Sequence, residues 1–292
     1  MKLVFDQISK NYGKKQALAG VSMTLSEGVY ALLGPNGSGK TTLMNILAGV
    51  LKASEGIITL DGKEIGTLGN EYRKLLGYLP QDPGFYPGFT VVEIISYFAS
   101  LKGIRLNEQE LKEKLEFVNL YNERKMKYKA LSGGMKRRLG IAVALIGQPH
   151  ILIMDEPTAG LDPKERIRFR NIISGISHDK IIIYSTHIVS DIESIADRVI
   201  MLKNGEIINN GPVCEITKTI KGKVWSCELE KNIAEEYVIN NNNTLITEMG
   251  SGCVILKIIS DEKPLESASE AVPSLEDAYM YYYGEKEKLP EL

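Results

Sequence analysis

The sequence has few of the residues that build disulfide or zinc scaffolds. Its 292 residues include three cysteines, Cys214, Cys227 and Cys253, and none of them belongs to a CxxC pair. This spacing excludes a disulfide framework and a zinc ribbon, because both need thiols paired at short separations. The cysteine usage is that of a protein from a reducing compartment.

The chain also lacks a strong charge of either sign. Its 35 lysines and arginines nearly balance 37 aspartates and glutamates, and the formal net charge is -2. A nearly neutral chain has no general attraction to nucleic acid, so any anion that it binds must be held by a local site. We therefore expect no nucleic-acid partner.

Long hydrophobic runs are missing as well. No stretch approaches the roughly 18 to 20 apolar residues that cross a bilayer, and the first ten residues, MKLVFDQISK, lack the apolar core of a signal peptide. Hydrophobic residues still make up 43% of the chain, which is long enough for one large domain with an appendage. We expect a cytoplasmic protein, free or held at a membrane by a partner.

Strand and helix patterns alternate along most of the chain. KLVFDQISKNYG alternates apolar and polar residues as an edge strand would, and VYALLG is a short buried strand ending in glycine. TTLMNILAGVL then has helical spacing. Further strands follow in ILIMDEP, in KIIIYSTH and in a hairpin around Asn204-Gly205. The pattern predicts an α/β fold with a mostly parallel sheet and an antiparallel β edge.

A helical insert interrupts this core over about residues 85–147. Thr90 with Glu93, and Asn107 with Glu110, form capping boxes ahead of amphipathic segments. A later helix is expected to begin at Asp162, with Pro163 in its first turn and Glu165 completing a third box.

The sequence pattern changes after Gly211-Pro212. We therefore predict a domain over residues 1–218 and a small α+β appendage over residues 219–292. Short strands are expected around the polar run INNNN, and a terminal helix is expected after Ser274. The predicted strands are KVWSCELE, TLITEMG and CVILKII.

The segment GPNGSGKTT matches the phosphate-binding loop G-x-x-x-x-G-K-[ST] and lies between a predicted strand and a predicted helix. Its glycines allow backbone N–H groups to converge on phosphates, and the following helix directs its positive end to the same place. Lys40 is expected to reach the β- and γ-phosphates and Thr41 to hold Mg²⁺. The predicted nucleotide-binding residues are Gly34, Pro35, Asn36, Gly37, Ser38, Gly39, Lys40, Thr41 and Thr42.

A second strand end supplies acidic groups. Asp155, at the end of ILIMD, is placed to hold Mg²⁺, and Glu156 is placed to orient a water for attack on the γ-phosphate. His187 follows the strand IIIYST and could bind the γ-phosphate or orient Glu156 and the water. Gln81, in GYLPQD, indicates no function on its own.

The motifs together resemble a known family. The phosphate loop, the glutamine of LPQD, LSGGM, ILIMDEPTAGLD and the histidine of STH occur in the order found in ATP-binding subunits of ABC transporters. The resemblance covers about residues 1–215 and is strongest to the ATPase partners of ABC-2-type exporters of drugs and antimicrobial peptides. It implies an ATP hydrolase with a P-loop NTPase core that uses ATP and Mg²⁺.

The resemblance also assigns roles to single residues. Tyr12 would stack on adenine, and Gln81 would contact Mg²⁺ and the attacking water and sense a membrane partner. Asp162 would lie in the loop that crosses between two subunits. Ser132, Gly133 and Gly134 would bind the ATP held by the phosphate loop of a second subunit, so that hydrolysis requires a dimer. Many relatives have Gln where this chain has Met135, and the contacts of that amide are lost here.

These roles imply a transport ATPase that pairs with itself or with a related subunit and drives a separate transmembrane permease. The ATPase would then sit peripherally at the cytoplasmic face of the membrane. The partner is expected to dock near Gln81 and the loop DPGFYPGF, where Phe85, Tyr86 and Phe89 are either contact groups or core. Export is expected over import, and a non-transport ATPase acting on ribosomes or DNA is the alternative.

Overall fold

The computed structural model describes residues 1–241, 243–249 and 252–284, and the chain divides into two compact units between Asn209 and Asn210. Each unit is described by itself. This boundary precedes the expected one after residue 218. The reason is that helix α9 (Val213–Lys218) packs against helix α11 (Leu275–Tyr283) and so belongs to the second unit.

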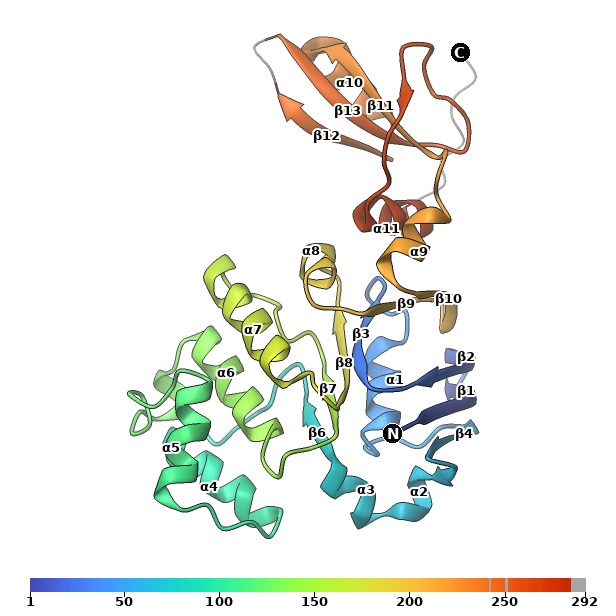
Figure 1. The fold of residues 1–292 in the computed structure, drawn as a ribbon. Coiled ribbons are helices and arrows are strands. Elements are labelled where there is room, and N and C mark those ends of the chain that lie inside the picture. Colours follow the sequence, from blue (N-terminus) through green and yellow to red (C-terminus); the bar gives the residue numbers. More distant parts are fainter. Residues whose placement is uncertain (242, 250–251, 285–292) are drawn as a thin grey trace. The chain divides into compact units, whose positions relative to one another are not determined.

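The first unit is built on a six-stranded sheet (Figure 1). Five neighbouring strands pair in parallel and β10 completes the hairpin at one edge, as the sequence predicts for the core of a P-loop NTPase. Asn204 and Gly205 turn this hairpin with φ values of 50° and 83°. In sheet order the strands are β10 (Glu206–Gly211), β9 (Arg198–Lys203), β3 (Gly28–Leu33), β8 (Ile181–Thr186), β7 (Ile151–Met154) and β6 (Leu76–Leu79).

A second, antiparallel sheet lies in the same unit. β1 pairs with β2 on one side and with β4 on the other, so the expectation of an edge strand is wrong. Its alternating pattern reflects a sheet with one buried and one exposed face, a pattern that interior antiparallel strands share with edge strands. The sheet order is β2 (Lys15–Leu25), β1 (Leu3–Tyr12), β4 (Glu55–Leu60) and β5 (Lys63–Glu64).

One hydrophobic core joins the two sheets. It contains Phe5 of β1, Leu32 of β3 and Leu43 of α1 (Lys40–Leu47), all nearly inaccessible to solvent. The short helices α2 (Ile65–Leu68) and α3 (Asn70–Leu75) lead from the antiparallel sheet to β6. This packing fixes the start of α1, where the phosphate loop ends.

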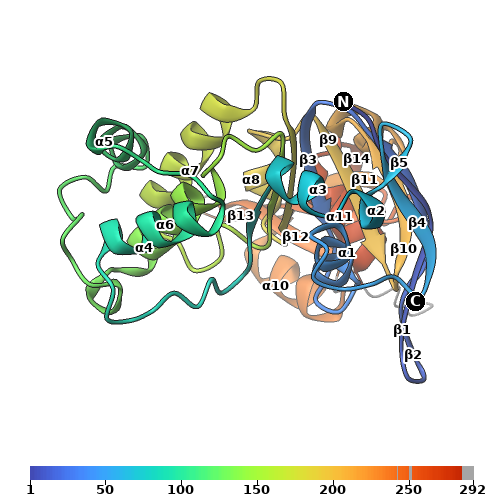
Figure 2. The same cartoon turned by 90° about the horizontal axis from the view of Figure 1, so that it is seen from below.

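The helical insert forms as expected, with capping boxes at Thr90 and Asn107. Figure 2 shows its helices gathered on one side of the sheet. Phe85 is buried and makes edge contacts with Phe98 and Tyr128, so it belongs to the core, whereas Tyr86 remains exposed. The insert contains α4 (Val91–Leu101), α5 (Glu108–Phe117), a 3₁₀ turn (Tyr128–Ala130) and α6 (Gly133–Ala144).

Asp162 caps α7 (Pro163–Ile176), since its carboxylate accepts a hydrogen bond from the Glu165 backbone N–H at 2.9 Å. The expected capping box is wrong. Glu165 turns its carboxylate to Arg138 of α6 and to Arg168, and a buried arginine is a stronger partner than a backbone N–H. Helix α8 (Val189–Glu193) follows β8.

The second unit contains an antiparallel sheet in the order β12-β13-β11-β14. The three predicted strands form, and Ser274 caps α11 in a box with Asp277. The sequence analysis missed helix α10, which includes Asn240 of the polar run; Asn242 and Glu285 lie outside the described residues. The elements are α9, β11 (Val224–Glu230), α10 (Lys231–Asn240), β12 (Thr244–Met249), β13 (Cys253–Ile259), β14 (Ser269–Glu270) and α11.

Candidate active site

The phosphate loop joins β3 to α1, and two of its glycines are required by close backbone approaches. A Cβ atom on Gly34 would lie 2.3 Å from the Leu202 carbonyl oxygen, and one on Gly39 would lie 2.6 Å from the Ala17 carbonyl oxygen. Gly37 differs, because a Cβ there would meet open space, although its φ of 82° disfavours other residues. The loop therefore presents bare backbone at the start of a helix, which suits an anion.

Lys40 is the first residue of α1 and is almost fully buried. Its Nζ donates hydrogen bonds to the carbonyl oxygens of Gly34 at 2.7 Å and Pro35 at 3.0 Å. Burial lowers the pKa of Lys40, while the carboxylates of Glu156 and Asp155 act in the opposite direction. The loop thus encloses its own cation beside two acidic groups.

A cleft of about 480 Å³ brings predicted residues from four segments together. Tyr12 lines it and is 49% exposed. It ends strand β1 rather than lying in the following turn, because β1 and β2 pair as far as Tyr12 and Lys15. The lining residues are Tyr12, Lys15, Ala17, Asn36, Gly37, Gly39, Lys40, Thr41, Thr42, Gln81 and Glu156.

Asp155 and Glu156 leave β7 in different environments. Asp155 is 1% exposed and accepts a hydrogen bond from the Ser185 hydroxyl at 2.6 Å. The same hydroxyl accepts one from the Glu156 backbone N–H at 2.8 Å. Glu156 has a φ of 46°, in the left-handed region, so Ser185 stabilises an unusual backbone conformation. The sequence analysis missed Ser185, whose signal is a hydroxyl inside the buried run IIIYST.

Side chains from two other loops contact the Glu156 carboxylate. Gln81 Nε2 donates to Glu156 Oε2 at 3.4 Å, and His187 Nδ1 lies 3.3 Å from Glu156 Oε1. The Glu156 side chain is 13% exposed and that of His187 is 48% exposed. One carboxylate is therefore held at the cleft wall by an amide and an imidazole, a geometry that can fix its orientation.

The donor set also fits Mg²⁺. Thr41 and Gln81, which have side-chain oxygen atoms, line the cleft, and Asp155 has a buried carboxylate one residue before Glu156 of the lining. Mg²⁺ prefers oxygen ligands and keeps several of its waters, so one carboxylate and two neutral oxygens beside a phosphate site are sufficient.

The LSGGM turn does not line this cleft. Ser132 caps α6, its hydroxyl accepting from the Met135 backbone N–H at 3.3 Å, and both Ser132 and Gly133 are exposed. None of the residues that line the Tyr12 cleft, all in the described part of the chain, comes from this turn. Helices α6 and α1 also lie apart in both views (Figures 1 and 2). The turn has the form of an anion site without a phosphate loop of its own chain beside it.

Comparisons with known proteins identify the family of this chain. The family model described as ABC transporter matches residues 18–159. YxlF, an ABC transporter ATP-binding protein of Bacillus subtilis (strain 168), is 34% identical over 294 residues, which cover 95% of this chain and 98% of YxlF. The chain belongs to the ABC transporter ATP-binding proteins. An ABC ATPase of this kind is an ATP-hydrolysing enzyme.

Other ABC proteins extend the comparison. The linearmycin resistance ATP-binding protein LnrL of the same Bacillus strain is 34% identical, covering 74% of this chain and 71% of LnrL. Among solved structures, the dimeric cassette MJ0796 has a TM-score of 0.66 and 26% identity, covering 72% of this chain and 98% of that chain. Each of these two similarities covers about three quarters of this chain.

Proposed function

We propose that this ABC ATPase hydrolyses ATP at composite sites formed by two copies and powers export through a separate membrane subunit. The observation that carries the hydrolytic part is the Glu156 carboxylate, which Gln81 and His187 hold at the wall of the cleft containing the phosphate loop. A group fixed in this way can orient a water for in-line attack on the γ-phosphate.

Each residue then has a defined task. The loop backbone and Lys40 bind the phosphates, and the ring of Tyr12 stacks on adenine. Thr41, Gln81 and Asp155 hold Mg²⁺, which when bound neutralises charge on the phosphates. Glu156 orients the water, and His187 keeps Glu156 in position with its ring N–H.

The second half of each site is proposed to come from another copy. Ser132, Gly133 and Gly134 supply a hydroxyl and two N–H groups at the exposed start of α6, and Asp162 contributes to the interface beside them. The solved MJ0796 cassette, which is dimeric and in one structure binds ADP and Pi, supports this arrangement. Both half-sites are complete in this chain, which favours two identical copies.

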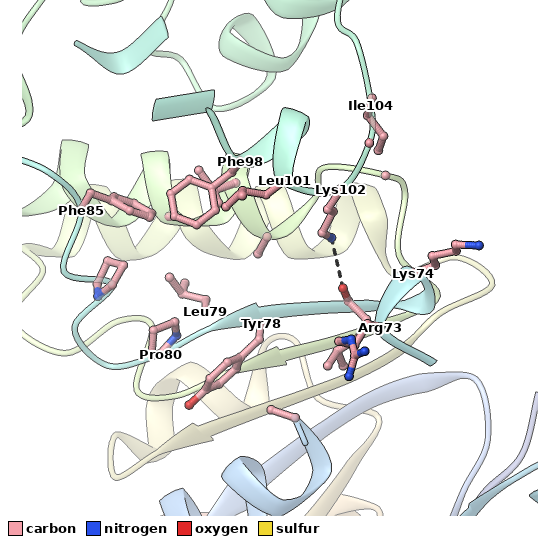
Figure 3. Close-up of a pocket in the computed structure, with 18 of the residues that line it drawn as sticks. Arg73, Lys74, Tyr78, Leu79, Pro80, Phe85, Phe98, Leu101, Lys102 and Ile104 are labelled. Carbon is pink, nitrogen blue, oxygen red and sulfur yellow. Dashed lines mark hydrogen bonds between the residues drawn. The ribbon is translucent and has the colours of Figure 1, made fainter. Parts of the chain in front are cut away.

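A membrane subunit is the proposed transport partner. Within the described residues, none of the helices combines the length and apolarity required to span a membrane. An apolar groove of about 870 Å³ opens between β6 and the insert, with Leu79, Pro80 and Phe98 along its walls and Arg73 and Lys74 at one end (Figure 3). Because Pro80 and Pro83, on either side of Gln81, both line the groove, we assign it to a cytoplasmic helix of the permease. This would place the ATPase at the cytoplasmic face of the membrane.

Export is proposed from the relatives. LnrL is named for linearmycin resistance, and a Burkholderia lata relative, 36% identical over 211 residues, is a Nod factor export ATP-binding protein. The transported molecule does not contact the ATPase, so its identity is not encoded in these residues.

Two variants test the composite site. Lys40→Ala disables a chain's own phosphate loop, and Ser132→Arg blocks the turn that it offers to a second copy. Each variant alone is expected to be inactive. An equimolar mixture should regain about a quarter of wild-type turnover, because half of the dimers are mixed and each mixed dimer contains one complete site. Full activity of Ser132→Arg alone would refute the role in a second copy.

A further inference from the structure

Arg137 connects two segments of the candidate site that are far apart in the sequence. It lies in α6, in the second turn after the cap Ser132. Its guanidinium NH1 donates to the carbonyl oxygen of Gln81 at 2.7 Å and, more weakly, to that of Pro80 at 3.4 Å. Its NH2 donates to the carbonyl oxygen of Glu156 at 2.7 Å.

These contacts fall on backbone outside the regular helices and strands. Gln81 is exposed in an irregular loop, and Glu156 adopts a left-handed backbone conformation just beyond β7. A guanidinium is planar, with N–H groups in a fixed fork, so it can fix the separation of two carbonyl oxygens in a way that a flexible ammonium cannot. Arg137 therefore sets the distance between the Gln81 loop and the Glu156 loop.

The guanidinium of Arg137 also lies close to the acidic groups of the site. Partial burial lowers its pKa, and the carboxylates of Glu156, Asp155 and Asp82 act against this shift. An arginine remains protonated despite such a shift in its pKa. Its neighbour Arg138 points elsewhere and pairs with Glu165 of α7. The two adjacent arginines thus have separate tasks, and Arg137 faces the Glu156 loop.

We propose that Arg137 is a positioning residue for ATP hydrolysis: by bridging the carbonyl oxygens of Gln81 and Glu156 it holds both side chains against the water that attacks ATP bound by the same chain. The inference rests on the proposed role of Glu156. It also has a consequence for the dimer. Helix α6 starts with the turn offered to a second copy, so Arg137 ties that helix to the chain's own catalytic loops.

Steady-state ATPase kinetics of the full chain provide the first test. Arg137→Met should lower kcat by about 10- to 100-fold, a typical cost of misplacing a catalytic group by about an ångström. KM for ATP should change less than about threefold, because the phosphate loop is untouched. Arg137→Lys should recover only part of kcat, since one ammonium cannot hold both loops. Arg124→Met is the matched control, because Arg124 donates to the Tyr121 carbonyl oxygen within the insert.

A kcat of Arg137→Met within twofold of wild type would overturn the inference, provided that Glu156→Gln is inactive in the same assay. If Glu156→Gln itself turns over normally, the result contradicts the proposed role of Glu156, on which the role of Arg137 rests. Thermal unfolding and ATP binding of each variant identify any that do not fold, and Arg137→Gln then replaces Arg137→Met.

Mixed dimers separate positioning from a general disturbance of α6. In a mixture of Lys40→Ala and Ser132→Arg chains, the active site uses Glu156 of the Ser132→Arg chain and the turn of the Lys40→Ala chain. Adding Arg137→Met to the Ser132→Arg chain should abolish most of the restored turnover. Adding it to the Lys40→Ala chain should leave that turnover within twofold. The reverse pattern would mean that Arg137 shapes the turn offered to the second copy, and would contradict the proposal.

Discussion

Two adjacent glycines of the LSGGM turn should respond in opposite ways to the same substitution. A Cβ atom on Gly133 would meet open space, whereas one on Gly134 would lie 2.8 Å from Cγ and 2.9 Å from Cδ of Glu165. Glu165 cannot easily move away, because its carboxylate pairs with Arg138, whose side chain is 8% exposed, and with Arg168. Gly134→Ala therefore forces an overlap that Gly133→Ala avoids.

The expected magnitudes follow from two opposing effects. Both glycines lie in the first turn of α6, where alanine stabilises a helix by up to about 0.5–1 kcal/mol relative to glycine. Only that gain applies to Gly133→Ala. At Gly134 the overlap costs about 1–3 kcal/mol, as overpacked sites usually do. The net result for Gly134→Ala is a loss of up to about 2.5 kcal/mol.

Urea unfolding followed by circular dichroism measures both free energies, and a double-mutant cycle with Glu165→Ala locates the cause. Glu165→Ala alone should cost about 3–5 kcal/mol, because it leaves Arg138 without its partner. In that background Gly134→Ala should no longer destabilise. Equal stability of the two alanine variants, or a Gly134→Ala cost that persists without Glu165, would refute the packing argument.

Substitutions at three further positions test the cleft and the cap of α7. Ser185→Ala removes both hydrogen bonds behind Asp155 and Glu156, so urea unfolding should show a loss of about 2–3 kcal/mol and ATPase assays a lower kcat. Tyr12→Ala should raise KM for ATP about 5- to 30-fold through lost stacking, whereas Tyr12→Phe should not. Asp162→Ala should cost about 1 kcal/mol in unfolding free energy, and Asp162→Asn, which retains the cap, should cost little.

The sequence predicted the parts of the fold that depend on neighbouring residues. The capping boxes at Thr90 and Asn107, the turn at Asn204 and the cap at Ser274 are local patterns, and all of them form. The phosphate loop was predictable for the same reason, since its glycine spacing and flanking elements lie within one short segment.

The features of the fold and the site that the sequence could not predict depend on contacts between distant segments. The interior position of β1 is set by β4, and the partner of Glu165 is an arginine 27 residues away in α6. Ser185 and Arg137 gain their roles only when β8 and α6 reach the Glu156 loop. The compact units divide before the expected boundary because α9 packs on a helix at the other end of its unit.

The most direct test of the proposed hydrolysis is Glu156→Gln in the full chain. The substitution keeps the side-chain size but removes the charge that orients the water, so we expect turnover to fall by at least about 10². ATP binding should remain, and size-exclusion chromatography with ATP should show a stable dimer that the ATP-free protein lacks. Wild-type turnover by Glu156→Gln would contradict the account.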